Sequence, residues 1–330
     1  MESTIFPDQH QQSFVPEKQE EDKKLEETGL ETVTQEIPSE ISEIPSEISQ
    51  ISPEISEIPP DDDWIPPSVN LDSLTKTYTF ESPLPIQLDT NSPVILGIDE
   101  AGRGPVLGPM VYAAAYCPAT LDLGSSSFKD SKILKHTARR QLFRSLNPHL
   151  YIGYAVTVLS ASAISAAMFA NYNLNAQAHD TTIALIRRLS GSMNVSQIFV
   201  DTVGHPEPYQ AKLQRLFPNI EITVAKKADS LYKIVSVASI CAKVTRDGLI
   251  QEGRGSGYPS DPKTVAWLKE NMDPVFGWDD QVRYSWGTAK QLLDTQVGVD
   301  WHDENKVPAW TQAPIIGIEW YGTTLTDPFD

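Results

Sequence analysis

The sequence has 330 residues, of which 40% are hydrophobic and 21% charged, enough for one large domain or two modest ones. Two cysteines are too few for a disulfide framework, and no segment approaches the ~20 uninterrupted apolar residues of a membrane helix. The N-terminus has neither the basic nor the apolar region of a secretory signal, so we expect a soluble, intracellular protein.

The net charge of −18 is unevenly distributed along the chain. Residues 1–90 carry 21 acidic and 4 basic side chains, whereas residues 91–300 carry 18 acidic and 21 basic ones. The part after the first 90 residues is therefore mildly cationic, which is compatible with a polyanionic substrate.

Residues 1–70 are rich in Glu, Ser, Pro and Gln, and an Ile-Pro-Ser-Glu-Ile-Ser-Glu pattern recurs between residues 36 and 60. Prolines interrupt helices, and the acidic composition leaves too little apolar surface to offset the entropy of ordering. This stretch is predicted to be a disordered acidic tail. Trp64 and the apolar positions between 78 and 88 predict a lead-in segment, residues 71–93, that packs on the following domain.

The regular part of the sequence begins at residue 94, where β-branched apolar runs predict strands and helical spacing predicts helices. The predicted strands are 94–99, 109–117, 151–158, 198–201 and 220–224. The predicted helices are a short one ending near 146, one from about 161 capped by Ser160 or Ser162, 173–190, 206–216, and one after Asp229. Three antiparallel strands followed by alternating helices and strands predict an α/β domain, residues 94–252, with a mixed sheet covered by helices.

Residues 253–300 are predicted to form a C-terminal helical region, with helices at 263–271 and 287–296. It begins with a glycine-rich loop that holds one aromatic residue, Tyr258. The acidic, Trp-containing residues 301–330 are predicted to be a docking tail.

Four carboxylates from distant parts of the chain are predicted to meet at one edge of this sheet. Asp99 and Glu100 end the first strand, Asp201 ends a later one, and Asp229 begins a helix. Strand ends at one edge of an open sheet are where ligands bind in α/β folds. A strand end reaching solvent, or a simple helix cap at Asp229, is the alternative for each acid alone.

Oxygen ligands without His or Cys suit Mg²⁺, with Mn²⁺ as the alternative, and four acids are enough for two ions. The glycines around the first acidic pair match neither a dinucleotide-binding fingerprint, because residue 107 is Leu, nor a phosphate-binding P-loop. The carboxylates therefore have to explain this segment.

Several basic and aromatic residues are candidates for substrate contacts. Lys132 lies in a loop where it could meet a backbone phosphate, and Tyr258 could stack on a sugar or base. A cluster of lysines surrounds Asp229: Lys226, Lys227, Lys233 and Lys243. A solvated charged face for the lysines and a loop anchor for the tyrosine are the alternatives.

Over residues 94–295 the chain resembles type 2 ribonuclease H, in particular the catalytic (A) subunits of the eukaryotic heterotrimeric enzymes. The segment from Gly97 to Met110 carries the strongest match. Further matching motifs follow in the same order: Asp130 to Lys132, Asn171 to Asp180, Val200 to Gly204, Lys226 to Val244, and Gly255 to Pro259.

The resemblance implies a ribonuclease H-like, five-stranded mixed sheet flanked by helices, and it implies roles for named positions. Asp99, Glu100, Asp201 and Asp229 would be the metal-binding catalytic carboxylates. The Gly102-Arg103-Gly104 turn would sense the ribose 2′-hydroxyl, unless it is only a tight turn. Tyr258 would recognise the junction from ribonucleotide to deoxyribonucleotide, and Asn175 would contact substrate, unless it is a helix cap.

The same resemblance implies an endoribonuclease that cuts the RNA strand of RNA–DNA hybrids and single ribonucleotides in duplex DNA. Two-metal-ion hydrolysis would leave a 3′-hydroxyl and a 5′-phosphate. It also implies two non-catalytic partner subunits, B and C, bound through the C-terminal extension, and a nuclear location, with the cytoplasm as a further one. A DNA-directed nuclease or integrase-like phosphoryl transferase, or a non-catalytic nucleic-acid-binding scaffold, remains as an alternative.

Overall fold

The computed structural model describes residues 64–123, 136–146, 151–202 and 204–296. Most of the predicted acidic tail, Lys132 and the predicted docking tail lie outside these residues. The last seven residues assigned to the tail, 64–70, are described, and they pack on the domain. The Trp64 ring lies 6.0 Å from that of Phe143, and the Ser68 hydroxyl is 2.7 Å from that of Thr245. The segment that packs on the domain therefore begins at Trp64.

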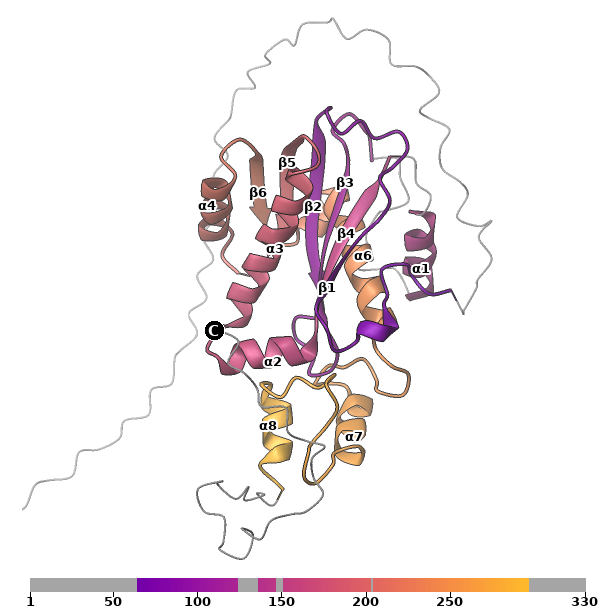
Figure 1. Ribbon diagram of the computed structural model, residues 1–330, viewed down its shortest axis with the longest axis vertical. Coiled ribbons are helices and arrows are strands. Elements are labelled where there is room, and N and C mark those ends of the chain that lie inside the picture. Colours follow the sequence, from indigo (N-terminus) through magenta and orange to yellow (C-terminus); the bar gives the residue numbers. More distant parts are fainter. Residues whose placement is uncertain (1–63, 124–135, 147–150, 203, 297–330) are drawn as a thin grey trace, which may run out of the picture. The chain divides into compact units, whose positions relative to one another are not determined.

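A six-stranded sheet in the order β1-β4-β3-β2-β5-β6 forms the centre of the fold (Figure 1). β1 pairs with β4, β4 with β3 and β3 with β2, all antiparallel. β2 pairs with β5 and β5 with β6, both parallel. The strands are β1 (Tyr78–Glu81), β2 (Val94–Ala101), β3 (Met110–Pro118), β4 (Gly153–Leu159), β5 (Val195–Asp201) and β6 (Glu221–Ala225). The five predicted strands and the mixed sheet are confirmed. The sixth, β1, comes from the lead-in segment and pairs with β4, whose edge would otherwise expose unpaired backbone groups.

The helices follow the predicted order. They are α1 (His136–Ser145), α2 (Ala161–Phe169), α3 (Leu174–Ser190), α4 (Pro206–Leu216), α5 (Ala228–Leu231), α6 (Lys233–Gly248), α7 (Pro262–Glu270) and α8 (Gly287–Leu293), with a 3₁₀ turn at Leu71–Ser73. Ser160 caps α2, because its side chain accepts a hydrogen bond from the amide of Ala163. The predicted helix after Asp229 consists of two, α5 and α6, because Tyr232 between them has an extended backbone.

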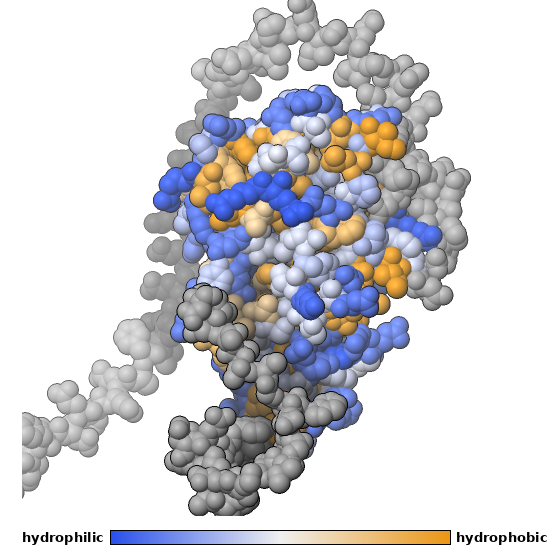
Figure 2. Space-filling model, in the orientation of Figure 1, coloured by the Kyte–Doolittle hydropathy of each residue, from blue (hydrophilic) through white to orange (hydrophobic). Residues whose placement is uncertain are grey.

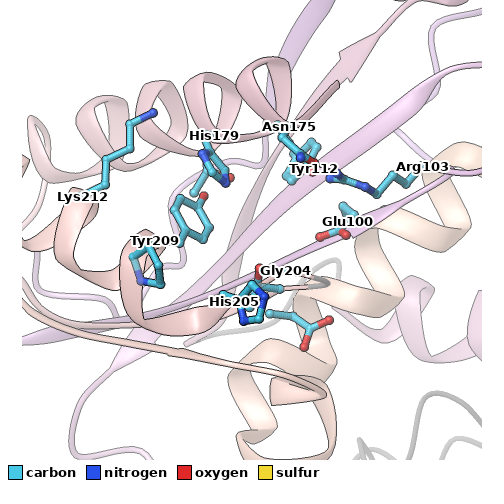
Figure 3. A pocket seen from close by; sticks show the side chains of 14 residues that line it. Glu100, Arg103, Tyr112, Asn175, His179, Gly204, His205, Tyr209 and Lys212 are labelled. Atoms are coloured by element: carbon cyan, nitrogen blue, oxygen red, sulfur yellow. Dashed lines mark hydrogen bonds between the residues drawn. The ribbon is translucent and has the colours of Figure 1, made fainter. Parts of the chain in front are cut away.

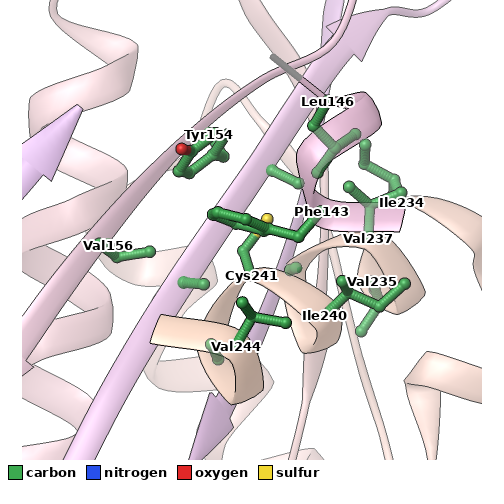
Figure 4. Packing of buried hydrophobic residues seen from close by; sticks show 14 of the residues in the cluster. Phe143, Leu146, Tyr154, Val156, Ile234, Val235, Val237, Ile240, Cys241 and Val244 are labelled. Atoms are coloured by element: carbon green, nitrogen blue, oxygen red, sulfur yellow. The ribbon is translucent and has the colours of Figure 1, made fainter. Parts of the chain in front are cut away.

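Helices cover both faces of the sheet and bury an apolar layer on each. One layer joins α1 and α6 to the sheet, and Figure 4 shows Phe143 of α1 and Cys241 of α6 within it. The other layer joins α3 and α4 to the opposite face. Both cysteines are buried and unpaired, as expected for packing residues. Figure 2 shows hydrophilic side chains over most of one face, interrupted by apolar patches.

The C-terminal helical region has its own small apolar cluster, in which Trp278 and Val282 pack with Leu268 of α7 and Ala289 of α8. Leu107, from the loop between β2 and β3, belongs to the same cluster. The C-terminal region is therefore attached to the loop that follows the first acidic strand. In the described part of the chain, no helix combines the length and apolarity needed to cross a membrane.

Candidate active site

The register of the parallel strands brings two of the predicted carboxylates to the same edge of the sheet. Ile98 of β2 pairs with Val200 of β5, so Asp99 and Asp201 each come one residue later on neighbouring parallel strands. Glu100 follows directly on β2. A one-residue shift in this register would turn Asp99 and Asp201 to opposite faces of the sheet.

The fourth carboxylate, Asp229, lies directly after the turn that follows β6. Lys227 has a left-handed backbone with φ 57°, which ends the extended chain and starts α5 at the next residue. The Ala228 amide then donates to Asp201 Oδ1 at 2.6 Å. Asp229, in the first turn of α5, is only 6% exposed. This contact brings the start of α5 to the end of β5.

The first acidic pair lies in an environment that opposes its ionisation. Asp99 is 5% exposed. Burial raises its pKa most, and Asp201 raises it further, while hydrogen bonds from Ser239 and from the Glu100 amide, at 2.7 Å, oppose the rise. The pKa of Glu100 is also raised, chiefly by burial and then by Asp99, Asp201 and Asp229. Glu100 is therefore close enough to the other three acids to be affected by their charges.

The chemistry of this donor set fits a hard divalent cation. The set contains carboxylate oxygens only, and a cation between mutually repelling carboxylates would relieve their repulsion. Within the described ranges, no three His, Cys, Asp or Glu side chains form a ready-made ligand group as they stand. Two of the acids are directed to backbone donors instead: Asp99 accepts from Glu100 and Asp201 from Ala228.

The Gly102-Arg103-Gly104 turn follows β2, and its carbonyls are held by the C-terminal region. Arg283 donates to the carbonyls of Gly102 at 2.6 Å and Arg103 at 3.1 Å, and Trp286 Nε1 donates to that of Gly104 at 2.9 Å. Arg283 is fully buried and lies over the Trp286 ring at 4.8 Å. Burial and the neighbouring Arg246 lower the pKa of Arg283, but a guanidinium remains charged at neutral pH.

Tyr258 lies next to this turn. Its Cε1 atom is 3.5 Å from the position that a Cβ on Gly104 would take, and its ring is 40% exposed. The Arg246 guanidinium lies 5.5 Å from the centre of the ring. Gly102 has φ +80°, and a Cβ there would come within 2.6 Å of the Arg246 side chain, so only glycine fits.

A cavity of about 490 Å³ opens beside the carboxylates (Figure 3). Glu100 and Asp201 are among the residues that line it. So are His179 of α3 and Tyr209 of α4, whose rings stack with their centres 3.9 Å apart. Burial, then Lys212 and Arg103, lower the pKa of His179, and Asp180 opposes this. The cavity therefore joins the acidic strand ends to a wall of stacked rings.

The structure brings most of the predicted site residues together. The four carboxylates share one edge of the sheet, and the Gly102-Arg103-Gly104 turn and Tyr258 adjoin each other. Arg103 donates to the side chain of Asn175. The helix cap is Asn173, not Asn175, because the Asn173 side chain accepts from the amide of Ala176. Lys132 lies outside the described residues.

The lysines near Asp229 differ from one another in the structure. Lys226 and Lys227 are exposed, as the solvated-face alternative expects. Lys243 is half-buried and donates to the Ser239 hydroxyl at 2.8 Å.

Sequence reasoning missed the residues that support the turn: Arg283, Trp286 and Arg246. The stretch Val282-Arg283-Tyr284-Ser285-Trp286 carries one signal, a lone arginine among apolar and aromatic residues, which is typical of a buried guanidinium with backbone partners. The partners of Arg283 lie about 180 residues earlier in the chain, so no spacing rule identifies them.

The chain is similar to known proteins in both sequence and fold. The family model described as Ribonuclease HII matches residues 96–289. The A-type subunit of ribonuclease H2 from Neurospora crassa is 51% identical over 253 residues, which are 69% of this chain and 80% of that protein. Its counterpart from Homo sapiens is 49% identical over 240 residues, covering 67% and 80%. The crystal structure of ribonuclease H2 from Pyrococcus horikoshii OT3 superposes with a TM-score of 0.54 at 31% identity, covering 61% of this chain and 97% of that one.

Proposed function

Since the chain belongs to the ribonuclease HII family, we propose that Asp99, Glu100, Asp201 and Asp229 form its catalytic centre. The chain is an endoribonuclease that cuts RNA–DNA hybrids and ribonucleotides embedded in duplex DNA, and its family is metal-dependent. The observation that carries the proposal is the register of β2 and β5, which puts Asp99 and Asp201 side by side at one sheet edge.

The proposed metal ligands are the same four carboxylates, holding two Mg²⁺ ions, with Mn²⁺ as the alternative. When bound, divalent cations supply an activated water and stabilise the charge on the departing 3′-oxygen. Cleavage on the 5′ side of the ribonucleotide then leaves a 3′-hydroxyl and a 5′-phosphate.

The chain's own residues provide the recognition of ribose in this proposal. The carbonyls of Gly102 and Arg103 are bound to Arg283, so the next amides in the chain, those of Arg103 and Gly104, point the opposite way across their trans peptides. These two donors are proposed to bind the 2′-hydroxyl. Tyr258, beside Gly104, is proposed to stack at the junction with DNA, and Asn175 to contact substrate together with Arg103.

The test is cleavage of a DNA duplex that carries one ribonucleotide, in Mg²⁺. We expect Asp99→Asn to lower kcat by at least 10³-fold while the duplex still binds, since a neutral amide is a poor Mg²⁺ ligand. An all-DNA duplex of the same sequence should stay intact. Equal cleavage by Asp99→Asn and the parent, or equal cleavage of the all-DNA duplex, would overturn the proposal.

We also propose that the chain assembles with two non-catalytic subunits, B and C. Its proposed location is the nucleus, with the cytoplasm as a further one. The partner subunits are supported by the names of the relatives at 49–51% identity, which carry a subunit letter and so imply an assembly of several chains. Purification of the full chain from its native cells, followed by identification of two stoichiometric partners, tests this part. Isolation of an active single chain would contradict it.

A further inference from the structure

Beneath the first acidic strand, α6 presents two polar residues that the activity described above does not use. Ser239 is fully buried, and hydrogen bonding by its side chain opposes the rise in the pKa of Asp99, so the two side chains are neighbours. Lys243, one helical turn later, places Nζ 2.8 Å from Ser239 Oγ. Ser239 therefore links Lys243, which is hydrogen-bonded to it, to the neighbouring carboxylate of Asp99.

The chemistry of the three groups allows only one direction of donation. A lysine ammonium has donors and no acceptor, so Lys243 must use a lone pair of the Ser239 hydroxyl. The single hydrogen of that hydroxyl is then free for the carboxylate, which when ionised only accepts. Polarised by the ammonium, the hydroxyl becomes a stronger donor to Asp99.

A glycine fixes the distance between this helix and the acidic strand. A Cβ on Gly97, two residues before Asp99, would come within 2.4–2.5 Å of the backbone of Ile234 and Val235. The backbone of α6 thus lies directly against β2 (Figure 4). At this separation a side chain as short as that of Ser239 reaches the carboxylate.

We propose that Ser239 and Lys243 are positioning residues that orient Asp99 for binding a divalent cation. Groups that hydrogen-bond to a metal-binding carboxylate set its direction and tune its affinity for the ion. Lys243 also places a fixed positive charge below a group of four acids. The proposal rests on the role of Asp99 in the proposed function, and it assigns Lys243 to the support of the acids instead of to contact with nucleic acid.

Metal binding without substrate tests the inference apart from cleavage. Mn²⁺ affinity of the full chain would be measured by isothermal titration calorimetry and by the electron paramagnetic resonance signal of free Mn²⁺. We expect Ser239→Ala and Lys243→Met each to weaken binding by about 10–100-fold. In cleavage assays the same variants should need more Mg²⁺ for half-maximal rate, while KM for the duplex at saturating Mg²⁺ stays within about twofold.

The matched control is Thr245→Val on the same helix. Thr245 is also fully buried, and its hydroxyl is hydrogen-bonded to that of Ser68 at 2.7 Å. The Thr245→Val variant should therefore unfold more easily than the parent but bind Mn²⁺ with the same affinity. If Thr245→Val weakens Mn²⁺ binding as much as Ser239→Ala, or if Ser239→Ala and Lys243→Met bind Mn²⁺ within twofold of the parent, the inference fails.

The double variant Ser239→Ala/Lys243→Met distinguishes one relay from two separate effects. Because Lys243 acts on Asp99 partly through Ser239 and partly by its own charge, the double variant should bind Mn²⁺ more weakly than either single variant but less weakly than the two losses combined would give. Fully additive losses would contradict the relay. A parent chain that binds Mn²⁺ but does not cut at ribonucleotides would refute the proposed function and leave the positioning result standing.

Discussion

Arg283 donates to the carbonyl of Gly102 at 2.6 Å, although 181 residues separate the two in sequence. The same guanidinium also holds the carbonyls of Arg103 and Gly108. One buried side chain from the C-terminal region thus fixes the orientation of three peptide groups in the loop between β2 and β3. The residue after Gly104 is proline, so the amides of Arg103 and Gly104 are the donors that this turn can present on its other side.

Replacing Arg283 with lysine tests whether this orientation matters. Lysine keeps the charge but cannot reproduce the planar fork that reaches three carbonyls. Buried carbonyls left without donors cost about 1–3 kcal/mol each, so we expect unfolding in urea at a clearly lower midpoint. We also expect cleavage at a single ribonucleotide to fall more than tenfold even under conditions where the variant is fully folded.

Arg254→Lys is the control for general damage to the C-terminal region. Arg254 is also buried, donates to both oxygens of Asp279, and lies 4.4 Å from the centre of the Trp267 ring. It does not touch the Gly102–Gly104 turn. The two variants should lose stability alike but differ in cleavage, and an equal loss of cleavage would argue against a specific role for the turn.

Gly97→Ala tests the close packing of α6 on β2. The added methyl would lie 2.4 Å from the carbonyl carbon of Ile234, a contact that neither backbone can avoid without moving. Overpacking of this kind costs typically 1–3 kcal/mol, and here it also moves α6 away from Asp99. We expect a lower unfolding midpoint and weaker Mn²⁺ binding. Gly287→Ala, where a Cβ meets nothing within 4 Å, should change neither.

The sheet and its acidic edge were predictable from local patterns. The apolar run ending on Asp201 predicted the end of β5 correctly, and the one ending on Asp99 stopped two residues before the end of β2 at Ala101. Helical spacing placed Asp229 in a first turn. Neighbouring parallel strands have their carboxyl ends at the same edge of the sheet, so these two acids can be expected to meet without knowledge of the side-chain packing.

The supporting contacts could not be predicted in the same way. The strand β1 pairs with β4 through the lead-in, whose short alternation at Tyr78–Glu81 is too weak a signal alone. The role of Lys243 depends on how closely α6 approaches β2. Gly97 permits this close approach, but a glycine in a strand does not by itself predict it. Contacts between residues far apart in sequence depend on the assembled fold.

Stability without metal should fall as pH rises. Burial and neighbouring acids raise the pKa of Asp99 and Glu100 above their ordinary values of 3.8 and 4.5, so the folded chain binds more protons than the unfolded one above about pH 4. The stabilising contribution is complete below the unfolded values and is lost as pH rises through the folded ones. In EDTA, Asp99→Asn should therefore be more stable than the parent at neutral pH, by about 1–3 kcal/mol.

Asp261→Asn is the control of opposite sign. Hydrogen bonds from the Ser256 amide and hydroxyl lower the pKa of Asp261 to about 2, so its contribution is present at neutral pH and is lost as pH falls. Urea midpoints between pH 2 and pH 8 measure both variants, because the contribution of Asp261 is lost below about pH 4. Adding Mn²⁺ at neutral pH should stabilise the parent more than Asp99→Asn. If the difference in stability between the parent and Asp99→Asn in EDTA did not change with pH, the electrostatic picture of the site would be wrong.

Tyr258→Phe separates the ring of this residue from its hydroxyl. The ring remains beside Gly104, and since it is 40% exposed, folding stability should not change. Loss of the hydroxyl should lower cleavage at a single embedded ribonucleotide by about tenfold or more, with a smaller effect on a continuous RNA–DNA hybrid, while Tyr258→Ala should impair both. Tyr172→Phe is the control, because Tyr172 is 39% exposed and its hydroxyl is bound to Asp180. The measurement is the ratio of the cleavage rates on the two substrates, taken for each variant. If Tyr258→Phe left this ratio unchanged, the hydroxyl would have no part in recognising the junction.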